Sequence, residues 1–277
     1  MEERIQRLNL FRKYFGEVVQ QVFPHMGWSY LNLTSDEENK LIAKAGFKLR
    51  SEFLKGTKYH YTITKNFIHY TSVSGLLSIL REGKIRLYEL HSLDDPQELS
   101  YSTKRVLAET IDQTQLDKLK RAIFSLSMCE VEEEKENLKD FNTWRLYGSD
   151  GYGAGLVLAM EGDNYIEQIS KVFYYEHELD DIKKLVNLSD EFMINESLIV
   201  ENLYESLFAR LLAFHKVGIY ELENEVRLTQ YMGNENYYYQ TIQYDLKNNK
   251  ERRFINKNLL SDFSERDPYE LTIKPKK

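Results

Sequence analysis

The stretch NFIHYTSVSGLLSILREGKIRLY, residues 66–88, contains the signals of a strand, a helix and a second strand in succession. Its first part, residues 66–70, is rich in β-branched and aromatic side chains, which favours a strand. Residues 74–83 predict a short helix, and Gly83 fits the left-handed position that follows a helix C-terminus. Residues 84–88 predict the next strand. We therefore expect a strand–helix–strand unit in this stretch.

The residues before this unit predict two helices and one more strand. Apolar side chains near the start recur at steps of three and four, which is helical periodicity: Ile5, Leu8, Phe11, Phe15, Val18 and Val19. A second helix is predicted for residues 37–53. We therefore expect residues 1–58 to form a helical N-terminal extension. Residues 59–64, a run of aromatic and β-branched residues, predict a strand.

The residues after the unit predict strands and helices in an irregular order. The expected strands are residues 122–128, 153–160, 169–175, 225–231 and 237–244, and the expected helices are residues 97–120, 180–186 and 196–214. Because this order lacks the alternation of βαβ units, it predicts an α+β fold with a mixed or antiparallel sheet. We expect a core domain over residues 59–245 and a basic C-terminal tail over residues 246–277.

The composition narrows the class of protein. The chain has 277 residues with 37 basic and 44 acidic side chains, a formal net charge of −7. Proteins that coat duplex nucleic acid nonspecifically usually carry the opposite sign, although a local basic patch would still hold a nucleic acid. Cys129 is the only cysteine, which excludes an internal disulfide and a cysteine-rich zinc site. No apolar run reaches the roughly 18 to 20 residues of a membrane span and no signal peptide is recognisable, so we expect a soluble cytoplasmic protein without membrane contact.

Several common sites are absent from the sequence. It contains no G-x-x-x-x-G-K-[ST] phosphate loop, no H-E-x-x-H and no G-x-S-x-G. The six histidines show no metal-ligand spacing, so we expect no metal site. Three clusters remain as candidates for chemistry: His69–Ser72 (H-Y-T-S), Trp144–Gly148 (W-R-L-Y-G) with the turn that follows it, and Glu221–Leu228 (E-L-E-N-E-V-R-L).

Each cluster also has a purely structural interpretation. His69 would be a core histidine at a strand end, and an aromatic pair spaced by three residues would be core packing. In the third cluster, a strand of period two places Glu223, Glu225 and Arg227 on one face. Its other face would hold Leu222, Val226 and Leu228. Two carboxylates about 7 Å apart repel each other unless a cation or a ligand hydroxyl meets them. Arg227 could be that cation, and the segment would then be an exposed strand stabilised by salt bridges.

In this order the clusters resemble the ADP-ribosyltransferase superfamily, particularly its DarT-like and RNA 2′-phosphotransferase-like members. H-Y-T-S followed by G-L-L-S-I-L-R-E-G is similar to the superfamily's first motif, and Glu223-x-Glu225 is similar to its third. The chain also resembles a large bacterial family with the pattern H-Y-T, D-P-x-E (Asp95–Glu98), W-x-x-Y and E-x-E-x-R. The resemblance spans about residues 66–230 and implies an ADP-ribosyltransferase-like split sheet.

The resemblance implies that NAD is the substrate and that several residues bind it. His69 would hydrogen-bond a ribose hydroxyl. An aromatic ring would stack on the cationic nicotinamide, a role that falls to Tyr147 with Tyr152 as its competitor. The other implied NAD-binding residues are Tyr70, Thr71 and Arg86, the last two on the diphosphate side.

The resemblance also implies two catalytic carboxylates. Glu225 would orient the ribose 2′-hydroxyl and offset the positive charge that develops as the glycosidic bond breaks. Glu223 would position or deprotonate the incoming nucleophile.

The sequence thus predicts an NAD-dependent ADP-ribosyltransferase. Similarity to DarT-like enzymes, and to the mRNA-modifying toxin of toxin–antitoxin–chaperone phage-defence systems, favours a nucleic-acid acceptor such as RNA over a protein. It also implies a neutralising antitoxin. Basic residues 250–253 and 274–277 would supply a local patch. Two alternatives are an NAD glycohydrolase, in which water replaces the acceptor, and a catalytically idle ligand-binding or interaction module.

Overall fold

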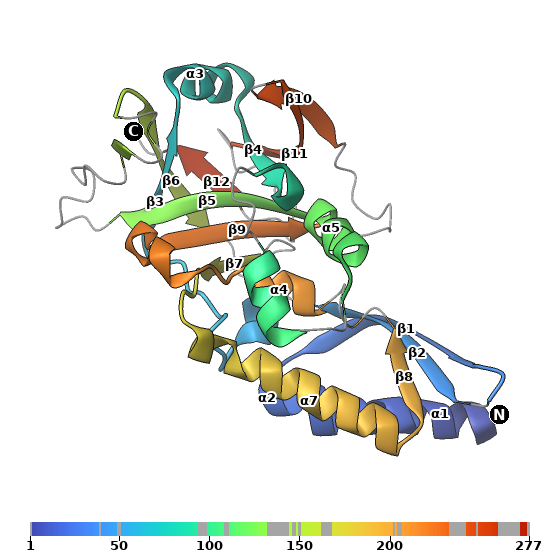
Figure 1. The fold of residues 1–277 in the computed structure, drawn as a ribbon. Helices are drawn as coiled ribbons and strands as arrows, with labels where there is room; N and C mark the ends of the chain where they lie inside the picture. The colour runs from blue at the N-terminus through green and yellow to red at the C-terminus, as the bar shows by residue number, and fades with distance from the viewer. Residues whose placement is uncertain are drawn as a thin grey trace.

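The computed structural model describes residues 2–38, 40–48, 51–93, 99–107, 111–131, 144–145, 148, 151–161, 168–201, 203, 207–232, 242–247, 249–259 and 272–275. These residues form a large sheet above a smaller layer of helices and strands (Figure 1). The predicted fold class, α+β with mixed and antiparallel sheets, is confirmed.

The large sheet has nine strands and branches at β5. Its main order is β10-β11-β4-β5-β3-β6-β12, while β9 pairs with the other edge of β5 and with β7. All strand pairs described in this sheet are antiparallel. The bounds are β3 Asn66–Thr71, β4 Lys84–Glu89, β5 Ile123–Val131, β6 Ala154–Glu161, β7 Gln168–Lys171, β9 Glu225–Tyr231, β10 Gln243–Lys247, β11 Lys250–Asn258 and β12 Thr272–Pro275.

Two strands share one edge of β5 and then separate. β4 pairs with β5 at Phe124 and Ser125, whereas β3 pairs with it from Cys129 to Val131. Beyond these pairs β3 and β4 diverge, and α3 (Val73–Glu82) joins their ends at the top of the molecule (Figure 1). The sheet is therefore split at residues 126–128 of β5.

The predicted strand–helix–strand unit is confirmed because local contacts fix its ends. The Ser72 hydroxyl precedes α3 and accepts a hydrogen bond from the backbone N–H of Gly75 at 3.0 Å. Gly83 ends the helix with a φ of 63°, a conformation that glycine adopts without strain. Both signals lie within the helix's own sequence neighbourhood.

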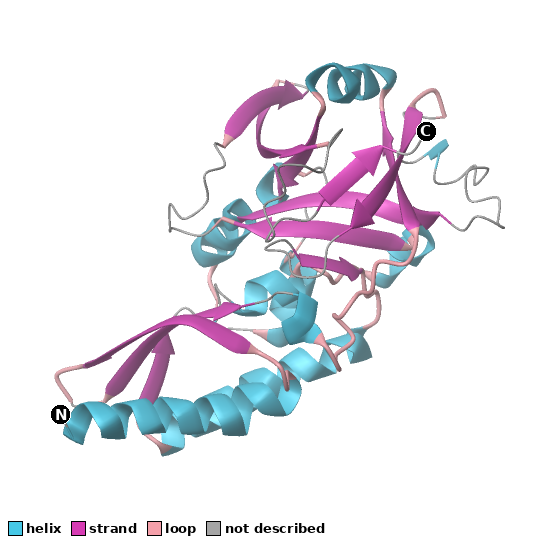
Figure 2. Ribbon diagram, turned by 180° about the vertical axis from the view of Figure 1, so that it is seen from behind, coloured by secondary structure: helices cyan, strands magenta, loops and turns pink. Residues whose placement is uncertain are grey.

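The lower layer joins the N-terminal residues to a segment from the second half of the chain. α1 runs on through a π-helical turn into α2 and lies beside α7 (Figure 1, Figure 2). The hydroxyls of Tyr14 and Ser189 are hydrogen-bonded across these helices at 3.1 Å. β1 and β2 form a hairpin, and β8 pairs in parallel with β2. The bounds are α1 Glu2–Tyr14, π-turn Phe15–Val19, α2 Gln20–Val22, β1 Gly27–Ser35, β2 Leu41–Lys48, α7 Asp180–Asn195 and β8 Leu198–Glu201.

The helix predicted for residues 37–53 is wrong, so residues 1–58 are only partly helical. Residues 41–48 form β2, whose buried side chains alternate as a strand requires: Leu41, Ala43, Ala45 and Phe47. The helix predicted for residues 196–214 is also wrong in part. Its start is strand β8, whereas the described residues 203 and 207–208 are helical and α8 covers Ala209–Leu212.

Other boundaries also differ from prediction. Residues 60–64 form neither a helix nor a strand, and the helix expected over residues 97–120 is two helices, α4 (Ser100–Val106) and α5 (Gln113–Ala122). The basic C-terminal tail is wrong as a description of residues 250–258, which form β11 between β10 and β4. Residues 237–241 of one predicted strand lie outside the described residues.

Two apolar cores hold the fold together. The lower core joins α1, α7, α8 and the small sheet through residues such as Phe11, Phe47 and Phe208. The upper core lies between the large sheet and α3 and contains Ile79, Leu126 and Leu228. Among the described helices, none is long and apolar enough to cross a membrane.

Candidate functional site

His69 lies near the end of β3, beside the split in the sheet. Its ring is half-buried, and Nδ1 lies 3.0 Å from the backbone oxygen of Ser127 on β5. Because a carbonyl oxygen only accepts hydrogen bonds, Nδ1 carries the proton and donates it. Burial lowers the pKa of His69, and the bond to Ser127 only partly offsets this effect. The neutral ring therefore presents Nε2 as an acceptor, which suits a ligand hydroxyl.

The middle motif packs against the end of the first motif. The rings of Tyr70 and Trp144 meet edge to face with their centroids 5.0 Å apart. Gly153, in the turn that leads into β6, approaches β3 so closely that an added Cβ would lie 2.4 Å from the backbone oxygen of Thr71. Segments far apart in the sequence thus form one contact region at the end of β3.

Gly153→Ala is expected to disturb this contact region. The new methyl group would meet backbone atoms, which cannot rotate away, so we expect a loss of about 1–3 kcal/mol in the free energy of unfolding. Gly16→Ala is the matched control, because its Cβ would meet nothing within 4 Å and its backbone is helical. Thermal unfolding measures both variants. An unchanged midpoint for Gly153→Ala would contradict the close approach.

β5 places the first and third motifs on its two edges. Ile68 of β3 pairs with Cys129 of β5, and Cys129 pairs with Glu225 of β9. Neighbouring strands lie about 4.8 Å apart, so the backbones of Ile68 and Glu225 are about 10 Å apart. His69 is the next residue along β3. Strand alternation places the side chains of Ile68, Cys129 and Glu225 on one face of the sheet and that of His69 on the opposite face, where its ring lies against the backbone oxygen of Ser127 on β5.

Glu225 belongs to a buried cluster of four charged side chains. Nε of Arg227 donates to Oε1 of Glu225 at 2.8 Å, and Nζ of Lys216 lies 2.7 Å from Oε2. Lys216 also lies 2.8 Å from Oε2 of Glu223, so one ammonium group bridges both carboxylates. Arg227 further donates to the backbone oxygen of Ala213. Two carboxylates and two cations make the cluster formally neutral.

Pairing with two cations keeps Glu225 ionised despite its burial. Its side chain is 4% exposed and that of Arg227 only 1%. Burial alone would raise the pKa of Glu225, but the charges and hydrogen bonds of Arg227 and Lys216 outweigh it and lower the pKa to about 2. Glu225 is therefore a fixed negative charge near neutral pH.

The predicted arrangement of the third cluster is confirmed only in part. Val226 and Leu228 are buried in the upper core, on the face of β9 opposite Glu225 and Arg227. The strand is buried, so the exposed salt-bridged strand of the structural interpretation is wrong.

The residues before Glu225 are not part of the strand. Glu223 ends the 3₁₀ helix Gly218–Glu223, and Asn224 follows in a left-handed conformation with a φ of 44°. Leu222 is 85% exposed instead of lying on a strand face. Glu223 meets Glu225 through Lys216, a cation outside the motif.

Other predicted site residues lie elsewhere or outside the described residues. Arg86 is paired with Asp245 of β10 at 3.0 Å and with Glu82 at 3.4 Å, so the structure gives its guanidinium carboxylate partners. Tyr152 is 86% exposed in the turn before β6. Tyr147 and Asp95–Glu98 lie outside the described residues.

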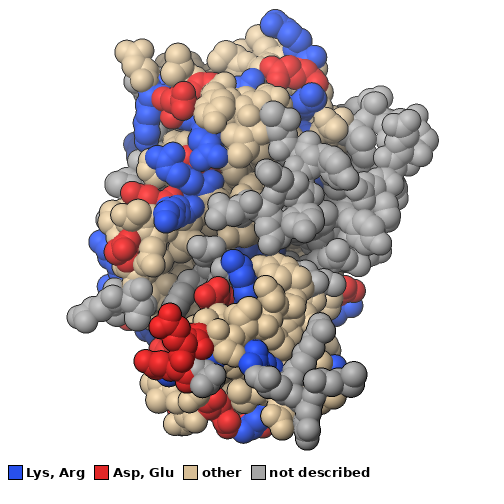
Figure 3. Space-filling model, turned by 90° about the vertical axis from the view of Figure 1, so that its right-hand side faces the viewer, with Lys and Arg blue, Asp and Glu red and all other residues tan. Residues whose placement is uncertain are grey.

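The basic stretch at residues 250–253 does not form a uniform patch. Its Arg252 donates to Asp245 at 2.9 Å and 3.0 Å, within β10 and β11. In Figure 3, basic side chains in the upper half of the face lie interspersed with acidic ones.

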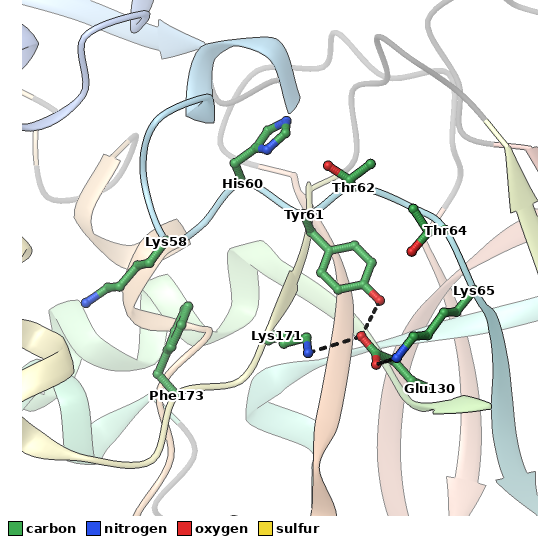
Figure 4. A pocket seen from close by; sticks show the side chains of 9 residues that line it. All are labelled: Lys58, His60, Tyr61, Thr62, Thr64, Lys65, Glu130, Lys171 and Phe173. Atoms are coloured by element: carbon green, nitrogen blue, oxygen red, sulfur yellow. Dashed lines mark hydrogen bonds and ion pairs between the residues drawn. The ribbon is translucent and has the colours of Figure 1, made fainter. Parts of the chain in front are cut away.

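A cavity of about 320 Å³ lies between residues 58–65 and the ends of β5 and β7 (Figure 4). It is close to Glu225 in the sheet, because its Glu130 follows Cys129 on β5 and its Lys171 pairs with Val226 on β9. The other lining residues are Lys58, His60, Tyr61, Thr62, Thr64, Lys65 and Phe173. We call this cavity the lysine pocket.

Glu130 contacts three of the other side chains that line the lysine pocket. Its carboxylate accepts a hydrogen bond from the Tyr61 hydroxyl at 2.6 Å and lies 2.9 Å from Nζ of Lys65 and 3.3 Å from Nζ of Lys171 (Figure 4). Burial acts to raise the pKa of Glu130, but these three partners lower it below its usual value. With Lys58, the lining carries three lysines and one carboxylate, 3 − 1 = +2 in formal charge.

Sequence reasoning missed this pocket. The available signal was the position of Lys58 and Lys65 at either end of the Y-H-Y-T-I-T run, with His60, Thr62 and Thr64 at alternate positions between them. Nothing near Lys171 or Glu130 in the sequence links them to that run.

No protein-family model, curated protein or solved structure matches the chain. Within the part of the chain that the structure describes, no group of three or more His, Cys, Asp or Glu side chains is placed to hold a metal ion.

Proposed function

We propose that this chain is an NAD-dependent ADP-ribosyltransferase that transfers ADP-ribose to a macromolecule. The observation that carries the proposal is the placement of His69 and Glu225 on the two strands that flank β5. One is a neutral hydrogen-bond acceptor and the other a fixed negative charge, at the split of one sheet. In the proposed reaction the first orients a ribose hydroxyl and the second offsets the developing positive charge, and the two side chains leave opposite faces of the sheet.

His69, Glu225 and Lys216 each have a separate role in the proposed reaction. Nε2 of His69 accepts a hydrogen bond from a ribose hydroxyl and orients the sugar. A carboxylate with a pKa of about 2 is too weak a base to remove a proton efficiently, so Glu225 acts by stabilising the positive charge that develops on the ribose. Lys216 is the cation that must yield for a ribose hydroxyl to reach Oε2 of Glu225.

Glu223 and the aromatic residues complete the proposed site. Glu223 shares Lys216 with Glu225 and would position the incoming nucleophile once that lysine moves. Tyr147 is proposed to stack on the nicotinamide, with Tyr152 as its competitor. Tyr70 and Thr71 would hold the end of β3 against the middle motif, close to the bound dinucleotide.

NAD affinity should depend on pH through His69. Because the pKa of His69 is lowered from its usual value of 6.5, Nε2 is an acceptor throughout the neutral range and becomes protonated only in more acidic solution. We expect NAD affinity to be constant through the neutral range and to fall only in solutions more acidic than the usual histidine pKa of 6.5. Calorimetric titrations at several pH values test this. The glutamine in His69→Gln does not titrate, so an equal loss of NAD affinity in acidic solution in this variant would refute the proposed role of His69.

The proposed activity is tested with NAD labelled on its adenylate phosphate. Purified protein and a bacterial extract are incubated with the label, and the products are then divided between nuclease and protease treatments. Label released only by nuclease supports a nucleic-acid acceptor, and label released only by protease supports a protein acceptor. Free ADP-ribose without a labelled macromolecule would mean that the protein is an NAD glycohydrolase instead.

A second candidate is a catalytically idle binding module. It is favoured by the complete pairing of Glu225 with Arg227 and Lys216, which leaves the carboxylate 4% exposed. Failure to consume NAD with any acceptor, while NAD still binds, would favour this candidate.

The resemblance to DarT-like enzymes supports the further proposal that the protein is a toxin or phage-defence effector with an RNA acceptor and a neutralising partner. Expression of the active protein should then arrest bacterial growth. Normal growth with abundant soluble wild-type protein would count against this role.

A further inference from the structure

We propose that the lysine pocket binds the phosphate backbone of a single-stranded nucleic acid. This inference rests on the proposed function, because it identifies the macromolecule that receives ADP-ribose and the surface that holds it.

The cations of the pocket are held in place before any ligand binds. Lys65 and Lys171 come from distant segments, yet both ammonium groups lie within 3.3 Å of the Glu130 carboxylate. Glu130 is 8% exposed, whereas the two lysine side chains are 38% and 53% exposed, so the anchor is buried and the ammonium groups face solvent. Ordering these long side chains in advance removes part of the entropy cost of binding an anion.

The remaining residues that line the pocket suit a nucleic-acid strand better than a single anion. Lys58 and Lys65 are seven residues apart on the segment that lines one side of the pocket, a separation of at most about 23 Å for a fully extended chain. Between them, His60, Thr62 and Thr64 also line the cavity, with the His60 and Thr62 side chains pointing away from Glu130 (Figure 4). Several lysines spread over a pocket lining of this length suit the repeated phosphates of a polymer better than one phosphate group.

Two aromatic rings in the pocket favour unpaired bases. Phe173 and Tyr61 both line the cavity, and both are half-buried. A cationic groove combined with aromatic side chains is typical of proteins that bind single strands, because exposed bases stack on the rings while lysines contact the backbone. The acidic Asp181, 3.7 Å from Lys58, weakens that end of the pocket, so Lys65 and Lys171 carry most of the expected affinity.

The position of the pocket connects it to the proposed reaction. Lys171 pairs with Val226, the residue after Glu225, and Glu130 pairs with Phe67, so both pocket side chains lie on the face of the sheet that carries His69 and opposite the face that carries Glu225. A nucleic acid bound in the pocket would therefore approach the proposed site of bond cleavage from the face of the sheet that carries His69.

The inference is tested by fluorescence anisotropy with a labelled single-stranded RNA oligonucleotide and the full-length protein, without NAD. We expect Lys171→Gln and Lys65→Gln each to weaken binding about 5- to 10-fold, the loss of roughly one charge-assisted contact, and to reduce the salt slope by about 0.7. The control Lys40→Gln changes the net charge equally, but at the exposed Glu38–Lys40 pair beside the β1–β2 turn, and should have no effect.

Each outcome supports or overturns the inference independently of NAD chemistry. Absence of RNA binding by the wild type, or equal weakening by Lys40→Gln, would overturn it even if NAD is consumed. Equal affinity for poly-L-glutamate of the same charge would overturn the assignment to nucleic acid. RNA binding that depends on Lys65 and Lys171 in a protein that never consumes NAD would support the pocket and refute the proposed activity. A DNA oligonucleotide of the same sequence distinguishes the two kinds of strand.

Discussion

Glu225→Gln is expected to lower NAD turnover by about 10²-fold or more while NAD affinity stays nearly unchanged. The substitution keeps the shape of the side chain but removes the negative charge that is proposed to stabilise the developing cation on the ribose. Chromatographic measurement of NAD consumption gives the turnover, and calorimetric titration gives the affinity. In cells, the variant should also lose any arrest of growth caused by the wild type.

The ion pairs of Glu225 make a matched control necessary. Glu225→Gln leaves Arg227 and Lys216 buried without their shared carboxylate, so lower turnover could follow from a disturbed fold. The double variant Glu225→Gln/Lys216→Met restores the neutrality of the cluster and should recover stability without recovering turnover. Turnover equal to the wild type in either variant would refute the catalytic assignment of Glu225.

Arg227→Met is expected to cause the largest loss of stability, about 3–5 kcal/mol. The guanidinium is 1% exposed and donates to both Glu225 and the backbone oxygen of Ala213, so its removal leaves a buried carboxylate short of a cation and a carbonyl short of a donor. A loss of this size corresponds to a fall in the thermal midpoint of the order of 10 °C. Urea denaturation provides the free energy directly.

Arg105→Met is the control for Arg227→Met. Arg105 also pairs with a carboxylate, that of Glu176, but both side chains are about half exposed. Exposed ion pairs contribute at most about 1 kcal/mol, so this variant should remain close to the wild type. Equal effects of the two substitutions would mean that burial does not govern the stability of the charge cluster.

The parts of the fold that could be predicted from sequence are those whose signals are local. Ser72 and Gly83 lie directly at the ends of α3, and each fixes its end through contacts within a few residues. The alternation of Glu225 and Arg227 with Val226 and Leu228 is likewise a property of one strand. Such signals need no knowledge of the partner segment.

The parts that were mispredicted depend on distant partners. Residues 41–48 contain leucine, alanine and lysine, which favour helices, but β1 and β8 supply strand partners on both sides of them. Lys216 lies outside the E-x-E-x-R motif, so the bridged carboxylates could not be inferred from the motif alone. The lysine pocket joins residues 58–65 to Glu130 and Lys171, which meet only through the pairing of the large sheet.

The parallel pairing of β2 with β8 also constrains how the chain can fold during synthesis. Leu41 pairs with Leu198, so the small sheet cannot be completed until residues 198–201 have left the ribosome. Until then the edge of β2 is open to pairing with other chains, which is a recognised route to aggregation. Slow closure of such a distant contact is also expected to limit the folding rate. A fragment that begins at residue 59 would lack β2 and expose the lower core, so the N-terminal residues cannot be removed as a separable appendage.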